Sequence, residues 1–182
     1  VLPNKQCCSD PIPTKLLREL INSLAPFLTL LFNRSLITGV VPSSFKSAYV
    51  TPLLKKSNLD PTEVSSYRPI SNLSVLSKLL ERLVMSQIKK HIEAFHLLPV
   101  SQSAYRAFHS TETAVLKVRS DLLQAVDSGD MGVLVFLDLS AAFDTMDHDI
   151  LLKRLSVSRG FAGSVIEWFK SYLSRRTQYV LY

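Results

Sequence analysis

A carboxylate at the end of an apolar run is the feature of this sequence that most clearly indicates chemistry. Residues 133–137 are five consecutive large apolar side chains, rich in β-branched and aromatic types, and Asp138 follows directly. Such a run predicts a strand that is buried on both faces. A buried carboxylate loses its hydration, and a metal ion, a helix N-terminus or an ion pair must offset that free-energy cost. Spacing alone leaves the metal site and the helix N-cap equally open.

The residues that follow favour the metal. The heptapeptide 138–144, Asp-Leu-Ser-Ala-Ala-Phe-Asp, resembles the first palm motif of reverse transcriptases, in the form typical of LINE-type (non-LTR) retrotransposons. The resemblance implies that Asp138 binds the catalytic metal ions and that the carbonyl of Leu139 adds a contact. It also implies that Phe143 is the steric gate, which packs where the 2′-hydroxyl of a ribonucleotide would lie. Asp144 is expected to have a structural role.

Further stretches resemble the same family, and they occur in the family's order. That order is more specific than any one motif, and the resemblance extends over most of the chain. The stretches are the segment upstream of the fingers (8–13 and 41–46), the first block (67–71 with Lys78 and Glu81), the second block (102–113) and the segment after the palm motif (168–173 with Arg175, Gln178 and Val180).

The implied fold is α+β, an incomplete right-hand polymerase in which helical fingers pack on the first strands of the palm sheet. The chain is expected to stop before the template-grip motif and before the hairpin that carries the other metal-binding carboxylates, and to lack thumb and endonuclease. The expected divisions are an upstream helical extension of the fingers (1–66), the fingers (67–130) and a truncated start of the palm (131–182).

The resemblance implies two Mg²⁺ ions in the complete enzyme, about 3.5–4 Å apart, which activate a primer 3′-hydroxyl. The partners would be an RNA template, a DNA primer and deoxynucleoside triphosphates, with action inside the cell and in the nucleus. Arg68, Lys78 and Arg106 are candidates for phosphate contacts, although a structural ion pair is nearly as well supported for Lys78. One carboxylate cannot hold two metal ions, so residues 1–182 alone are predicted not to polymerise.

Two positions depart from the family pattern. Ala107-Phe108 replaces the Pro-Gly that is common between the arginine and the His-Ser-Thr of the second block. This change is expected to disturb a turn in the fingers. Met146 stands where a small β-branched residue is usual, and this change is expected to be tolerated.

Hydrophobic periodicity and capping residues predict the other elements. Ser74, Ser110 or Thr111, and Asp147 are the expected helix caps, and for Asp147-His148-Asp149 a cap is preferred to a metal site. The helix after residue 110 is expected to bury Val115, Val118, Leu122 and Val126. The predicted helices are 15–24 and 26–39, paired as a hairpin, then 74–95, 110–129, 148–155 and 164–173, with a short edge strand at 47–56 and a strand at 177–182.

Composition sets wide bounds. The formal charge of +6 is compatible with a polyanionic partner, although a solvated basic surface is the commoner meaning. No apolar run approaches the roughly 20 residues of a membrane span, so no membrane association is expected. Adjacent Cys7 and Cys8 suit a reducing compartment. The alternatives to a polymerase are a degenerate retroelement remnant that acts at most as a nucleic-acid-binding or interaction module, a group II intron-type polymerase, and a helical scaffold.

Overall fold

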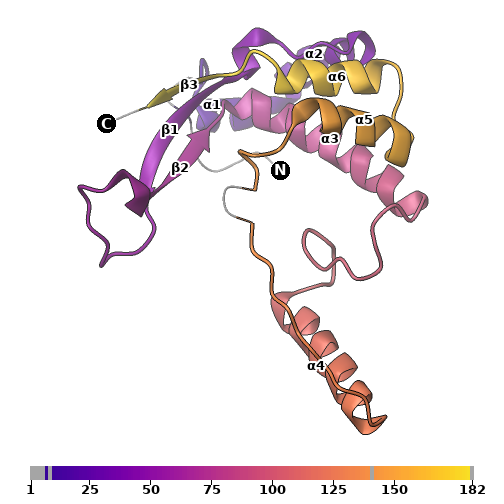
Figure 1. The fold of residues 1–182 in the computed structure, drawn as a ribbon. Coiled ribbons are helices and arrows are strands. Elements are labelled where there is room, and N and C mark those ends of the chain that lie inside the picture. The colour runs from indigo at the N-terminus through magenta and orange to yellow at the C-terminus, as the bar shows by residue number, and fades with distance from the viewer. Residues whose placement is uncertain (1–6, 8–9, 140–141, 181–182) are drawn as a thin grey trace. The chain divides into compact units, whose positions relative to one another are not determined.

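The computed structural model describes residues 7, 10–139 and 142–180 (Figure 1). The chain forms two compact units, one made of Val1–Lys90 with Asp147–Tyr182 and the other of His91–Met146. The mixed α+β architecture expected from the sequence is confirmed. Its elements are α1 (Thr14–Glu19), α2 (Ile21–Thr38), β1 (Ser47–Leu54), β2 (Tyr67–Asn72), α3 (Val75–Ala94), α4 (Thr111–Asp127), α5 (His148–Arg159), α6 (Ser164–Leu173) and β3 (Thr177–Val180), with short 3-10 turns at Ser43–Phe45 and Val64–Ser66.

The sheet of the first unit has the strand order β2-β1-β3 (Figure 1). β1 and β2 are antiparallel, and β1 and β3 are parallel. β1 is therefore the central strand, and the prediction that it lies at an edge is wrong. Pro52 misled that prediction, because proline cannot donate a hydrogen bond to a ladder. The described part of β3 pairs only as far as Val50, so Pro52 needs to face only Pro69 of β2.

The core of the first unit lies between α2, α3, α6 and the turn before β1. Its buried members are Phe32, Val41, Phe45, Leu80 and Trp168, and the apolar stripe of α3 packs against them. The predicted start of α3 is confirmed, since the Ser74 hydroxyl accepts a hydrogen bond from the amide of Ser77 at 3.2 Å. Burial of these large side chains is the main stabilising term of the unit.

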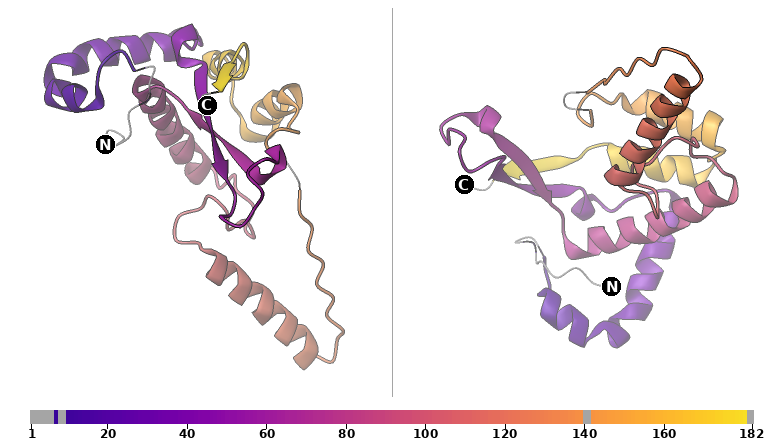
Figure 2. Two further views of the ribbon diagram at one scale, coloured as in Figure 1. Left: turned by 90° about the vertical axis from the view of Figure 1, so that its left-hand side faces the viewer. Right: turned by 90° about the horizontal axis from the view of Figure 1, so that it is seen from below.

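α1 and α2 divide at a different residue from the one predicted. The break falls at Leu20, whose ψ of 8° leaves helical geometry, and α2 continues through Pro26. The two helices are the indigo and purple ribbons in Figure 2. Proline removes one hydrogen bond and is best tolerated near a helix start. Pro26 lies in the second turn of α2 and is exposed, so the helix tolerates it. The predicted end at Gly39 is confirmed, with φ at +67°.

Gly39 is also the point of close approach between α2 and α6. A Cβ atom there would lie 2.8 Å from the Cβ of Glu167 and 2.9 Å from the carbonyl oxygen of Ser164. No other residue type fits both this contact and the left-handed backbone without displacing α6.

The start of α5 confirms a cap for residues 147–149. The Asp147 carboxylate accepts hydrogen bonds from the amides of Asp149 at 2.9 Å and Ile150 at 3.0 Å. These bonds satisfy amides that the helix itself leaves without partners, and the negative charge suits the helix N-terminus.

In the second unit, α4 has the predicted cap but not the predicted burial. Ser110 and Thr113 form a reciprocal capping box. Val115 and Val126, which were expected in a core, are each 60% exposed. An apolar helix face is buried only where another element covers it. Among the described residues of this unit α4 is the only complete helix, beside the last turn of α3, and there is no strand, so the burial prediction is wrong for this chain.

The apolar run 133–137 does not form the buried strand that its composition predicts. It carries no strand assignment, and its side chains are exposed, Val133 by 85% and Phe136 by 84%. A strand needs a hydrogen-bonding neighbour. The sheet of the described residues consists of β1, β2 and β3, all from the other unit, and none of them pairs with this run.

Candidate active site

Asp138 lies at the end of the extended run in the second unit, and its side chain is exposed. Leu139 and Phe143 are each 78% exposed. The first helix among the described residues after Asp138 is α5, which Asp147 caps. An N-cap at Asp138 would bind the amides of residues 140 and 141, which lie outside the described residues, so the N-cap interpretation is not tested. Among the described residues Asp138 has no ion pair. The metal ion and the helix cap both stay predictions.

The donor chemistry at this point suits a hard cation. Mg²⁺ prefers oxygen ligands and is commonly bound through one or two carboxylates together with substrate phosphates. Asp138 provides a carboxylate, and Leu139 provides a carbonyl. Across the described part of the chain no group of three or more His, Cys, Asp or Glu residues is placed to hold a metal ion. Asp138 and Leu139 therefore suit part of a magnesium coordination shell, which needs further oxygen ligands.

The predicted phosphate-binding cations are divided between the units. Arg68 is exposed on β2, where it pairs with Leu53 of β1, and proline at position 69 keeps its backbone extended as expected. Lys78 is half-buried on α3. Both belong to the first unit, whereas Arg106 belongs to the second.

Arg106 organises the loop that precedes α4. Its guanidinium donates hydrogen bonds to the carbonyl oxygens of Pro99 at 3.4 Å and Val100 at 3.2 Å. A guanidinium carries five N–H donors, so these two bonds leave donors for another acceptor. The structure gives Arg106 a loop-holding role beside the predicted phosphate contact.

The departure at Ala107-Phe108 keeps a glycine-like backbone. Phe108 has φ at +61°, in the left-handed region that favours glycine, and its side chain is fully exposed. His109 Nδ1 lies 2.8 Å from the carbonyl oxygen of Ala107 and closes the turn. Phenylalanine therefore adopts the conformation at a cost of about 1 kcal/mol.

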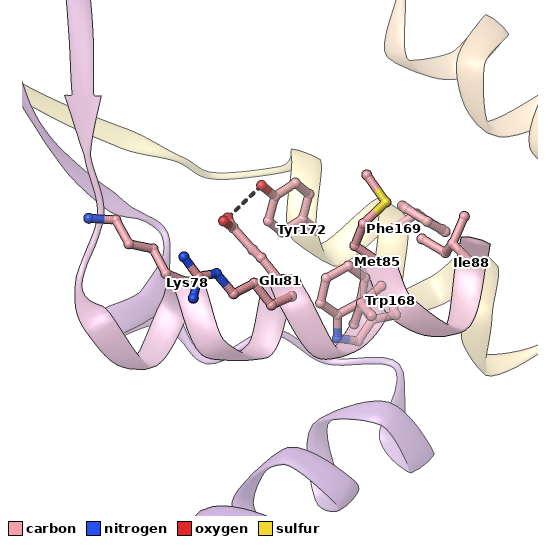
Figure 3. Close-up of a pocket in the computed structure, with 9 residues that line it drawn as sticks. Lys78, Glu81, Met85, Ile88, Trp168, Phe169 and Tyr172 are labelled. Atoms are coloured by element: carbon pink, nitrogen blue, oxygen red, sulfur yellow. Dashed lines mark hydrogen bonds between the residues drawn. The ribbon is translucent and has the colours of Figure 1, made fainter. Parts of the chain in front are cut away.

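A pocket of about 380 Å³ lies between α3 and α6 in the first unit (Figure 3). Tyr172 donates a hydrogen bond to the Glu81 carboxylate at 2.7 Å and stacks on Trp168 with ring centroids 5.2 Å apart. The Arg176 guanidinium lies 4.6 Å from the Tyr172 ring centroid. Lys78 lines the pocket, and its ammonium group is directed away from the Tyr172–Glu81 pair (Figure 3).

Sequence reasoning placed Glu81 and Tyr172 in separate motifs and missed their contact. They are 91 residues apart, and nothing in their spacing indicates proximity. Their bond ties the stretch expected to be the first block to the segment expected to follow the palm motif. The structure thus joins two stretches that the sequence treats separately.

We expect the Tyr172 hydroxyl to lose its proton at an unusually high pH. Burial and the hydrogen bond to Glu81 raise the pKa of Tyr172 from 10.0 to about 12, against the lowering effect of Arg176. Between these pH values the folded chain keeps a proton that the unfolded chain loses, so the free energy of unfolding should fall as the pH rises through this window. In a pH titration, tyrosinate absorbance should show a step at the high-pH end that Tyr172→Phe removes. The exposed control Tyr105→Phe should leave this step in place, and a wild-type titration without it would contradict the assignment.

No helix in the described ranges combines the length and apolarity that a membrane crossing requires.

Residues 53–180 match the family described as reverse transcriptase (RNA-dependent DNA polymerase), and the chain belongs to this family. The match includes β2 and the Asp138–Asp144 motif, and it begins at Leu53, near the end of β1.

The relatives are longer proteins of mobile elements. The RNA-directed DNA polymerase from mobile element jockey of Drosophila melanogaster is 32% identical over 94% of this chain and 18% of its own length. The corresponding jockey protein of Drosophila funebris is 32% identical over 82% of this chain and 16% of its own length. The chain therefore spans less than a fifth of these relatives. The resemblance to enzymes of LINE-type elements is confirmed.

Proposed function

We propose that this chain is part of an RNA-directed DNA polymerase of a LINE-type retrotransposon, which extends a DNA primer along an RNA template. The observation that carries the proposal is the family match over residues 53–180, which contains the one exposed carboxylate motif expected to bind metal. The protein would act in the nucleus, at the site of insertion. The proposed divisions are an upstream extension (1–66), fingers (67–130) and the start of the palm (131–182).

The proposed roles follow the chemistry of each group. Asp138 and the Leu139 carbonyl supply oxygen ligands for magnesium, which when bound would stabilise the charge that develops on the transferred phosphoryl group. Phe143 closes the space beside the 2′ carbon of the incoming sugar. Arg68, Lys78 and Arg106 offer positive charge to the triphosphate. Further carboxylates must come from outside residues 1–182, so this segment alone is expected to be inactive.

The test is primer extension by the longest natural polypeptide that contains residues 1–182, on an RNA template with Mg²⁺. Extension should require the template and stop when the metal is chelated. Phe143→Ala should raise ribonucleotide use relative to deoxynucleotide use by about tenfold or more, because a lost steric contact is worth roughly 1–3 kcal/mol in discrimination.

Phe136→Ala is the matched control. Phe136 is an exposed phenylalanine of the extended run 133–137 in the same unit, and its replacement should leave the sugar preference unchanged. If the wild-type polypeptide binds RNA but never extends a primer, the remnant alternative replaces the polymerase. If Phe143→Ala keeps the wild-type preference, the gate assignment is wrong.

A further inference from the structure

A second pocket of the first unit is lined by positive charge that the proposed function does not use. Its volume is about 410 Å³, and it lies where the C-terminal ends of α2 and α6 meet the turn before β1. Lys46, Lys170 and Arg175 line it, with Glu167 as the carboxylate among its lining residues. Among residues 7, 10–139 and 142–180, none of these three cations forms an ion pair.

Lys46 is the most constrained of the three cations. It is only 9% exposed, and its ammonium donates a hydrogen bond to the Ser171 hydroxyl at 3.2 Å. Burial lowers the pKa of Lys46, and the neighbouring charges of Arg175 and Arg176 lower it further. A buried ammonium among other cations is unfavourable unless an anion compensates it.

The hydroxyl group of Ser171 has a hydrogen-bond donor that no described residue uses. Its hydroxyl oxygen accepts from Lys46 and, at 2.9 Å, from the amide of Val41. A hydroxyl group has two acceptor positions and one donor, so both acceptor positions are used. Within the part of the chain that the structure describes, the Ser171 hydroxyl donates to no acceptor. A half-buried donor in a cationic pocket is suited to an anionic oxygen.

Helix C-termini also attract cations, and this ordinary explanation accounts for part of the charge. Arg176 fits this explanation, since its guanidinium donates a hydrogen bond to the Tyr172 carbonyl oxygen at 3.1 Å. Lys46 does not fit this explanation, because its ammonium donates to a hydroxyl group rather than to a carbonyl. Arg175 is held at φ +53°, where arginine is strained, and it lines the pocket. Strain of this kind is retained where the surrounding structure requires it.

We propose that this pocket binds one backbone phosphate of a nucleic-acid strand, through Lys46, Arg175 and the Ser171 hydroxyl. The chemistry recognised is that of phosphoryl oxygens. The choice of a nucleic-acid strand over a free phosphate rests on the proposed function. The pocket is formed entirely by residues of the first unit, and none of its lining residues belongs to the unit that carries Asp138.

The test measures binding of a fluorescent single-stranded RNA oligonucleotide to the longest natural polypeptide, without Mg²⁺ and at several salt concentrations. Lys46→Met and Arg175→Asn should each weaken binding by about fivefold or more and reduce the salt slope by about 0.7, the value for one lost phosphate contact. Asparagine tolerates the left-handed backbone at position 175. Lys15→Gln, an exposed lysine of α1, is the control for loss of one charge.

The outcomes separate the two proposals. If Arg175→Asn folds and binds as wild type does, or if Lys15→Gln loses as much affinity, the pocket assignment is overturned. Inorganic phosphate and a deoxynucleoside triphosphate are added as competitors. If either competitor, at constant ionic strength, abolishes the difference in RNA affinity between wild type and Lys46→Met, the pocket binds a free phosphate rather than a nucleic-acid strand. If the wild-type polypeptide binds no RNA, the proposed function itself fails.

Discussion

Changing Asp138 to asparagine is expected to lower primer extension by the longest natural polypeptide by about 10³-fold or more. Asparagine keeps the size of the side chain and removes the negative charge that a Mg²⁺ ligand needs. Loss of several kcal/mol of transition-state stabilisation corresponds to a rate loss of this order. Because Asp138 is exposed and forms no ion pair within the described residues, its replacement should leave folding unaffected. The measurement is single-turnover extension at saturating template and primer.

The matched control is Asp130→Asn, which removes one exposed carboxylate from the same unit. This variant should extend primers at the wild-type rate. Raising the Mg²⁺ concentration should recover part of the activity of Asp138→Asn if the defect is weaker metal binding. Wild-type activity in Asp138→Asn would remove the metal role from this residue.

Leu80→Ala is expected to cost about 2–5 kcal/mol of unfolding free energy, the usual range for a buried leucine that leaves a cavity. Leu80 is 1% exposed and lies in the core cluster with Trp168. Urea unfolding of the 182-residue chain can be followed by the fluorescence of Trp168, the single tryptophan of the sequence. The midpoint should move to lower urea with little change in slope.

Leu30→Ala provides the comparison for the same chemical change at the surface. Leu30 is 71% exposed on α2, so the free energy of unfolding should stay within about 0.5 kcal/mol of wild type. Equal losses in Leu80→Ala and Leu30→Ala would show that the cluster is not the stabilising core.

The parts of the fold that the sequence predicted well are those with local causes. Ser74, Ser110 and Asp147 begin helices as expected, because a cap depends on the side chain and on amides two or three residues later. Gly39 ends α2 for a similar reason, since its left-handed backbone is a local property. The candidate site was likewise found from a short motif, and its proposed roles depend on that motif.

The parts that failed depend on partners distant in sequence. An apolar run such as 133–137 predicts burial, but the neighbour that would bury it is not encoded in the run itself. The same holds for the apolar face of α4. The central position of β1 could not be predicted, because its second neighbour, β3, lies 130 residues further along the chain. Pro52 indicated an edge, which applies only to the second half of the strand.

The parallel pairing of β1 with β3 has a consequence for synthesis on the ribosome. Ser47 pairs with Thr177, which lies 130 positions further along the chain, so one side of β1 has no strand to join until that length has been translated. At about 5–20 residues per second this delay lasts roughly 7–26 seconds. The hairpin with β2 can form early, but it leaves a nascent edge open to other chains. Slower elongation would prolong this exposure, so the yield of folded protein should depend on translation speed and on chaperones that cover extended segments.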